Sequence, residues 1–227
     1  MIVALDGPAG SGKSTTARRV ADRLGWLYLD TGAMYRAVGL AFREQGLPFT
    51  DDAAAALLPG LDVHLDPGPD GLRVALNGDD VTDRIRTPEA AESASRASAL
   101  APVREAMVAL QRRVARAHEA DGGVVVEGRD IGTVVFPDAD VKFFLVADLD
   151  ARAQRRLEQS GPDAGVQTFE GVRAEIAARD ARDETRALAP LRPADDAETL
   201  DTTGLSIDEQ VARVIVAVRR SQSASAT

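Results

Sequence analysis

The chain has 227 residues, a formal net charge of −9 and no cysteine. Its length suits one α/β domain with a buried core, and the missing cysteines exclude disulfides, thiolate nucleophiles and cysteine metal sites. The acidic balance argues against nucleic acid as the main partner, because neutralising a phosphate backbone needs a basic surface.

Five short apolar runs are predicted to form parallel strands, because helical patterns separate them. They cover residues 2–5, 27–29, 124–126, 141–146 and 199–201. Each run ends in polar residues, and in doubly wound sheets ligands bind beyond the carboxyl ends of the strands. The sequence therefore predicts an α/β fold, a doubly wound five-stranded parallel sheet with its site at that edge.

A complete G-x-x-x-x-G-K-[ST] phosphate loop, residues 7–14, follows the first predicted strand. Its glycines let backbone N–H groups surround a polyphosphate, Lys13 reaches the terminal phosphates, and the Ser14 hydroxyl is placed to ligate Mg²⁺. Apolar residues at helical spacing predict the helix that the motif requires after the loop. The expected ATP site comprises Gly7, Pro8, Ala9, Gly10, Ser11, Gly12, Lys13, Ser14 and Thr15.

Residues 61–86 interrupt the alternation of strands and helices. Strand-like pieces at 61–65, at 72–76 and at Val81 are joined by turns rich in glycine, proline and aspartate. They predict a small antiparallel insert, and a surface β-meander without a role is the alternative. Residues 88–118 follow as a helical pattern, with Pro102 in the first turn of a helix over 103–117.

Two charged helices are predicted over residues 150–159 and 169–185, joined by loop-like residues 160–167. A mobile flap over bound phosphates would have this build. In the second helix one narrow arc holds Val172, Ile176, Arg179, Asp183 and Arg186. The apolar stripe thus continues into charge, which indicates an Arg-Asp-Arg set facing a charged ligand. A frayed helix end is the alternative.

The remaining residues favour a small-molecule kinase. A regulatory GTPase needs a base-reading Asn-Lys-x-Asp segment, and the only other lysine, Lys142, lies in an apolar strand. A kinase for an alcohol needs a base or a positioning carboxylate, whereas a monophosphate acceptor is already anionic and needs arginines. The arginines that fit this demand, unless they form solvated surface pairs, are Arg36, Arg129, Arg152, Arg156, Arg179, Arg182 and Arg186.

Four blocks of sequence resemble the bacterial cytidylate kinases in content and order: residues 7–15, 29–36, 127–139 and 179–191. The second reads Leu-Asp-Thr-Gly-Ala-Met-Tyr-Arg, the third begins Glu-Gly-Arg-Asp-Ile-Gly-Thr, and the insert is similar to the enlarged monophosphate-binding region of that family. The resemblance spans nearly the whole chain. It implies Mg²⁺-dependent transfer of the γ-phosphoryl group of ATP to CMP or dCMP. A kinase for UMP, AMP or shikimate and a non-enzymatic nucleotide-dependent switch are the alternatives.

The resemblance implies roles for single residues at the phosphates. Thr31, Arg36 and Arg129 match the positions that hold the acceptor phosphate. Many relatives carry serine in place of Thr31 and aspartate in place of Glu127, and both changes keep the polar group. The resemblance and the demands of phosphoryl transfer together imply a catalytic set, with Ser14 as a ligand of the metal. The set comprises Lys13, Arg129, Arg152, Arg156 and Arg182.

The resemblance also implies a base-reading and sugar-contacting set. It comprises Ser95, Arg104, Asp130, Arg179, Asp183 and Arg186. Ser93 and Ser98 lie close to Ser95, so flanking residues decide the register. Tyr35 either packs beside the pyrimidine or is a core tyrosine. A hydroxyl and a carboxylate that accept from the amino group of cytosine predict about a ten- to hundredfold preference for CMP over UMP.

The expected organisation is one kinase unit, working as a monomer. Its core comprises residues 1–36, 119–159 and 187–220, its monophosphate-binding region 37–118 and its flap 160–186, with 221–227 as a disordered tail. ATP and CMP or dCMP are the expected partners. The chain shows no apolar stretch of transmembrane length and no signal peptide, so we expect a cytoplasmic protein that engages neither membrane nor nucleic acid.

Overall fold

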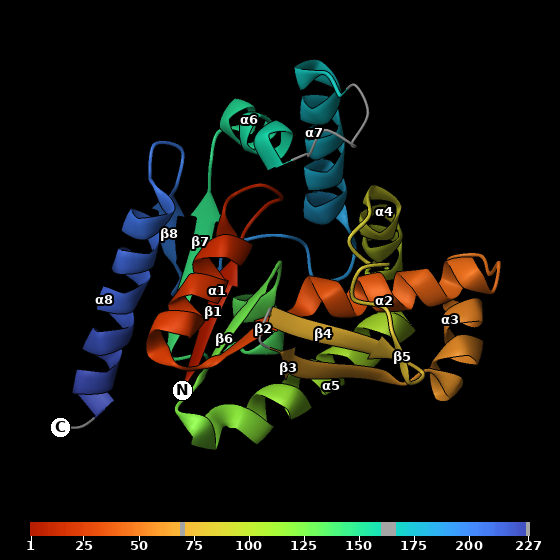
Figure 1. The fold of residues 1–227 in the computed structure, drawn as a ribbon, viewed down its shortest axis with the longest axis horizontal. Coiled ribbons are helices and arrows are strands. Elements are labelled where there is room, and N and C mark those ends of the chain that lie inside the picture. The colour runs from red at the N-terminus through yellow and green to blue at the C-terminus, as the bar shows by residue number, and fades with distance from the viewer. Residues whose placement is uncertain (69–70, 160–166, 226–227) are drawn as a thin grey trace.

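The computed structural model describes residues 1–68, 71–159 and 167–225. Its central sheet is parallel, with strand order β2-β6-β1-β7-β8 (Figure 1). The strands are β1 (Ile2–Asp6), β2 (Leu27–Asp30), β6 (Val124–Gly128), β7 (Val141–Val146) and β8 (Glu198–Asp201). All five predicted strands are confirmed. Because β1 lies between β6 and β7, the phosphate loop that follows it opens at the centre of the sheet edge, where ligands of such sheets bind.

Helices cover both faces of this sheet. The helices of the described residues are α1 (Lys13–Leu24), α2 (Thr31–Glu44), α3 (Asp51–Leu57), α4 (Pro88–Ala97), α5 (Ala101–His118), α6 (Leu149–Gln159), α7 (Phe169–Thr185) and α8 (Ile207–Ser225). Side chains of β1 alternate between the two faces, as a period of two requires. Val3 and Leu5 pack in a core with α1 and α8, whereas Ile2 and Ala4 pack in a second core with α2 and α5. Figure 1 shows these two groups of helices on opposite sides of the sheet.

The predicted antiparallel insert is present as a second, three-stranded sheet in the order β3-β4-β5. Its strands are β3 (Val63–Gly68), β4 (Gly71–Leu76) and β5 (Asp79–Asp80). Buried Val63, Val74 and Leu76 belong to the same core as α2, so the insert is part of the main fold and not a surface meander. Helices α4 and α5 follow it, with proline in the first turn of α5 as predicted.

The third insert strand is not where the sequence analysis placed it. It consists of the two residues before Val81, because Asn77 and Gly78 adopt φ angles of 52° and 90° and close a tight turn directly after β4. Val81 follows the strand as a buried residue, and its N–H donates to the carbonyl of Val74 at 2.9 Å.

Two predictions concern the C-terminal half. Helices α6 and α7 confirm the two charged helices, and residues 160–166 of the loop between them lie outside the described part of the chain. The prediction of a disordered tail is wrong for 221–225, which form the end of α8. The hydroxyl of Ser223 donates to the carbonyl of Arg219 at 2.9 Å, so it bonds within the helix. Residues 226–227 lie outside the described part.

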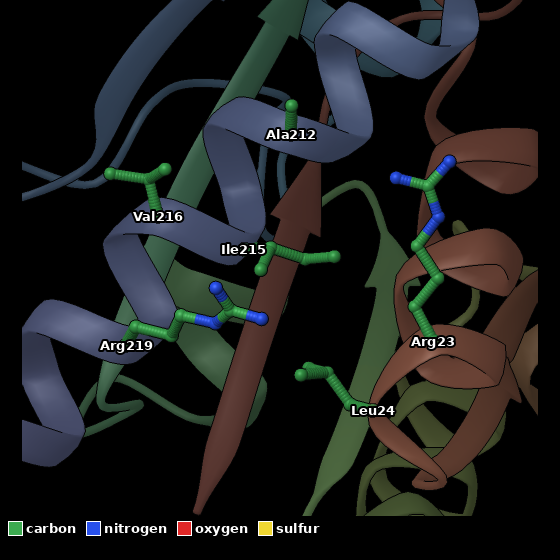
Figure 2. Close-up of a pocket in the computed structure, with 6 residues that line it drawn as sticks. All are labelled: Arg23, Leu24, Ala212, Ile215, Val216 and Arg219. Atoms are coloured by element: carbon green, nitrogen blue, oxygen red, sulfur yellow. The ribbon is translucent and has the colours of Figure 1, made fainter.

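A shallow hollow between α1 and α8 lies away from the phosphate loop (Figure 2). It is lined by Arg23, Leu24, Ala212, Ile215, Val216 and Arg219. Two of these residues end α1, roughly 15 Å along the helix from its N-terminus at a rise of about 1.5 Å per residue. None of the predicted site residues lines it. Within the described residues no helix has the length and hydropathy needed to span a membrane.

Candidate active site

The phosphate loop runs from β1 to α1 in conformations that suit glycine. Gly7 and Gly12 have φ angles of 149° and 88°. A Cβ atom on Gly7 would lie 2.2 Å from the carbonyl oxygen of Leu145 in β7, so no larger residue fits there. Lys13 begins α1 and its ammonium donates to the carbonyl of Pro8 at 3.2 Å. The ammonium is thus held over the loop, where the phosphates of a nucleotide would lie.

Residues from the C-terminal part of the chain hydrogen-bond to the phosphate loop and to the first turn of α1. The Thr202 hydroxyl donates to the carbonyl of Ser11 at 2.9 Å, and the Thr16 hydroxyl donates to the side-chain carbonyl of Gln210 at 2.7 Å. Both Thr202 and Gln210 are fully buried. Sequence reasoning missed Gln210, because a lone glutamine in an amphipathic helix has no local signal.

Arg152, a predicted catalytic residue, lies against the loop. Its guanidinium donates to the carbonyl of Ala9 at 3.1 Å and to that of Ala147 at 3.0 Å, and it pairs with Asp180 of α7. The Arg152 and Asp180 side chains are 9% and 11% exposed. The pair therefore ties α6 and α7 to the phosphate loop. Asp180 is absent from the predicted site.

A buried carboxylate stands beside the loop serine. The Ser14 hydroxyl donates to Oε2 of Glu127 at 2.8 Å, and the Tyr28 hydroxyl donates to Oε1 at 2.8 Å. The hydroxyl of Thr31, predicted at the acceptor phosphate, donates to the backbone carbonyl of Glu127 at 2.7 Å. Sequence reasoning noted Glu127 only as a replacement for aspartate and did not place it against Ser14.

These oxygens fit Mg²⁺. A loop serine and a carboxylate at the end of the neighbouring strand are the hard oxygen donors with which phosphate-loop proteins hold this ion. The described residues contain no group of three or more His, Cys, Asp or Glu side chains able to hold a metal. A magnesium ion bound there would keep waters and nucleotide phosphates as its other ligands. Ser14 and Glu127 are the residues that would hold it.

Several cations gather between the loop and α7. Burial, and then the neighbouring Arg129, lower the pKa of Lys13 to about 7 and that of Arg179 to about 10. The Arg129 guanidinium is held by Asp183, with Nε to Oδ2 at 2.9 Å. The Nε groups of Arg36 and Arg179 are buried and have no hydrogen-bond partner among the described residues. Repelling charges with unpaired buried donors form a site that an anion would stabilise.

The other predicted phosphate-side arginines lie around this cation cluster. Arg36 pairs with Asp30 at 2.7 Å, which holds it at the start of α2. Arg156 is exposed and close enough to contribute to the lowered pKa of Arg179. Arg182 is also exposed, and it faces the cavity between α4 and α7 instead of the loop.

The predicted base-reading residues meet on the other side of Arg129. The Asp130 carboxylate pairs with Arg104 and with Arg186, the latter at 3.3 Å. Asp130 and Arg104 are 5% and 6% exposed, and within the described part of the chain Nη1 of Arg104 has no hydrogen-bond partner. Tyr35 stands beside them, and burial raises the pKa of its phenol to about 12. The structure thus brings together residues that are up to about 150 positions apart in the chain.

A cavity of about 380 Å³ opens between α4 and α7 next to this group, lined in part by Ser95, Asp183 and Arg186. Of the three candidate serines, Ser93 and Ser98 donate to backbone carbonyls at 2.8 Å and 3.0 Å. Ser95 is the one that lines the cavity. The arc of α7 predicted from helical spacing is confirmed as far as Asp183, because its apolar part packs against α6 and Asp183 pairs with Arg129. Arg186 follows Thr185, the last residue of the helix, and has an extended backbone, so helical spacing does not place it.

Asp6, at the end of β1, was not predicted. Its carboxylate accepts the backbone N–H groups of Ile131 and Gly132 at 2.8 Å and 2.7 Å. Burial raises its pKa to about 6, although these hydrogen bonds oppose the shift. It thereby joins the phosphate loop to the turn that carries Arg129 and Asp130.

The family model for cytidylate kinase matches residues 3–220. The chain belongs to the cytidylate kinase family. The cytidylate kinase of Salinibacter ruber is 56% identical over 220 residues, which cover 96% of this chain and 97% of that protein. The cytidylate kinase of Rhodococcus opacus is 48% identical over 219 residues, which cover 96% and 94%. The four-block resemblance is confirmed, and the protein is a nucleotide phosphotransferase.

The solved structures show the same fold at lower identity. The crystal structure of an uncharacterized protein from Eubacterium ventriosum aligns with a TM-score of 0.52 and 14% identity, covering 95% of this chain and 96% of that one. At this identity the likeness supports the α/β architecture and carries nothing about the substrate.

Proposed function

We propose that this member of the cytidylate kinase family transfers the γ-phosphoryl group of ATP to CMP or dCMP. One observation carries the proposal: a single cation cluster joins the phosphate loop, at Lys13, to the base-reading group, at Asp130, through Arg129. A donor phosphate and an acceptor phosphate would meet at that cluster. Its chain-wide relatives named cytidylate kinase support cytidine as the base.

In the proposed reaction a phosphate oxygen of CMP attacks the γ-phosphorus of ATP in line. A new P–O bond forms as the bond to the β–γ bridging oxygen breaks, and ADP leaves with that electron pair. The acceptor oxygen is already anionic, so no general base is needed. Lys13, Arg129 and Arg179 orient the two phosphates and neutralise charge that spreads over the transferring group.

Mg²⁺ bound with ATP would supply charge neutralisation at the β- and γ-phosphates. Ser14 and Glu127 would hold it, as described above. Asp180 and Arg152 fix α7 over the loop, and we propose that residues 160–186 act as a flap that excludes water. We propose a monomer as the working unit.

Cytosine would be read by the group around Asp130. Its carboxylate accepts from Arg104 and Arg186, and it retains capacity to accept from the exocyclic amino group of cytosine. Uracil presents a carbonyl at that place. Repulsion from a buried carboxylate supports the preference of about ten- to hundredfold for CMP over UMP. The Ser95 hydroxyl, in the adjacent cavity, is the second proposed acceptor.

A coupled assay of ADP formation tests the proposal. ADP should appear with CMP and dCMP, and far more slowly with UMP, AMP, GMP or shikimate. The Lys13→Ala variant should lose about 100-fold or more in kcat while its melting temperature stays near that of the wild type. Equal turnover of UMP would overturn the base assignment, and ADP release without any acceptor would favour a nucleotide-dependent switch instead.

A further inference from the structure

The Tyr28 hydroxyl has no role in the proposed reaction, yet it hydrogen-bonds to Glu127, which is proposed to hold the metal. It donates to Oε1 of Glu127, while Ser14 donates to Oε2 of the same carboxylate. Each oxygen is therefore bound by a donor from a different element, β2 or α1. Tyr28 and Glu127 are 8% and 4% exposed, so water has little access to replace the phenol.

The register of the sheet explains how a tyrosine reaches this carboxylate. Tyr28 lies opposite Val125 in the parallel pair of β2 and β6. Residues two apart in a strand share a face, so Glu127 lies on the same face as Val125, about 6.6 Å further towards the carboxyl end. That is the α1 face, because Tyr28 and Val125 pack in the core with α1. A phenol spans the offset, and Ser14 lies over the same face at the start of α1.

A second donor matters because a glutamate carboxylate is on a flexible stem. Held only by Ser14, which is exposed in the first turn of α1, the carboxylate of Glu127 could rotate away from the metal side. Residues that hydrogen-bond to a metal-side group orient it and tune its affinity. A tyrosine hydroxyl carries its proton at neutral pH, so the Tyr28 phenol remains a hydrogen-bond donor to this carboxylate.

We propose that Tyr28 is a positioning residue that sets the affinity for the Mg²⁺ bound with ATP by fixing Glu127 beside Ser14. The inference rests on the proposed function only for the donor nucleotide and its metal, not for the acceptor. A measurement without CMP therefore tests it separately. Failure to phosphorylate CMP would overturn the proposed function and leave this test intact.

The experiment is a calorimetric titration of the full-length protein with ATP, at a series of Mg²⁺ concentrations and in EDTA. Tyr28→Phe removes the hydroxyl and keeps the ring. Mg²⁺ increases the affinity for ATP, and the Mg²⁺ concentration that gives half of this increase should be about tenfold higher in the variant. Tenfold is the lower end of the range seen when a residue that hydrogen-bonds to a metal ligand is removed. ATP affinity in EDTA should stay within about twofold of the wild type, since the phosphate loop is untouched.

Two further variants separate positioning from packing. In a Glu127→Gln background, Tyr28→Phe should shift the Mg²⁺ dependence by less than about twofold, because the charged group through which it acts is gone. Arg18→Met removes the guanidinium that lies 5.5 Å above the Tyr28 ring and leaves the hydroxyl, so it should match the wild type. A wild-type Mg²⁺ dependence in Tyr28→Phe, an equal loss in EDTA, or an undiminished effect in the Glu127→Gln background would overturn the proposal.

Discussion

Binding of ATP should be coupled to protonation of Lys13. Burial and the nearby Arg129 hold the pKa of this ammonium at about 7 in the free protein. The phosphates of ATP would place several negative charges beside Nζ and favour the charged form, returning the pKa towards its ordinary value of about 10.4. Above pH 7 the free protein has lost the proton that the complex needs. ATP binding must then take up a proton.

The size of this effect follows from the pKa. With a value of about 7, roughly 90% of the free protein carries the Lys13 proton at pH 6 and roughly 9% carries it at pH 8. Binding at pH 8 should therefore take up about 0.9 proton per ATP, and the affinity should be about tenfold weaker than at pH 6. Each further pH unit costs about another factor of ten, until the pKa of the complex is reached.

Calorimetric titrations with Mg²⁺ and ATP in two buffers of different ionisation enthalpy give the proton uptake directly. The matched control is Lys13→Gln, which cannot be protonated and should show a nearly constant, weaker affinity across pH 6 to 8. Arg129→Met removes one repelling cation and should move the midpoint to higher pH. If the wild type took up no proton at pH 8 and bound ATP equally at both pH values, the assignment of a lowered pKa to Lys13 would be refuted.

Further substitutions test other parts of the site and the packing of the fold around it. Asp130→Asn removes the charge that repels a uracil carbonyl and should lower the ratio of kcat/KM for CMP over UMP by about tenfold; an unchanged ratio would move base reading elsewhere. Gly39→Ala would put a Cβ 2.8 Å from backbone of α4 and should cost about 1–3 kcal/mol in urea unfolding, whereas Gly60→Ala meets nothing within 4 Å and should be near neutral. Asp180→Ala leaves Arg152 buried and unpaired and should cost about 3 kcal/mol; a loss below about 1 kcal/mol would show that the pair does not hold α7 to the loop.

Local sequence was enough to predict most of the framework. The strands are short β-branched or leucine-rich runs bounded by polar residues, and the phosphate loop is a contiguous motif whose glycines, Lys13 and Ser14 need no distant partner to be recognised. The charged arc of α7 was also predictable, because helical spacing alone places Arg179 and Asp183 on one line. Errors were confined to element ends: the first insert strand covers residues 63–68 instead of 61–65, the third ends before Val81, and α8 continues past residue 220.

The contacts between the phosphate-loop region and distant residues could be found only in the tertiary structure. Local motifs were sufficient to predict that Ser14 can bind a metal and that arginines can bind a phosphate. Chain folding decided that Glu127 stands 2.8 Å from Ser14, with Tyr28 on its other oxygen, and that Gln210 supports the loop. These contacts join residues 99 to 194 positions apart, through strand register and helix packing. No periodicity within one element encodes such a pairing, because it depends on which elements become neighbours.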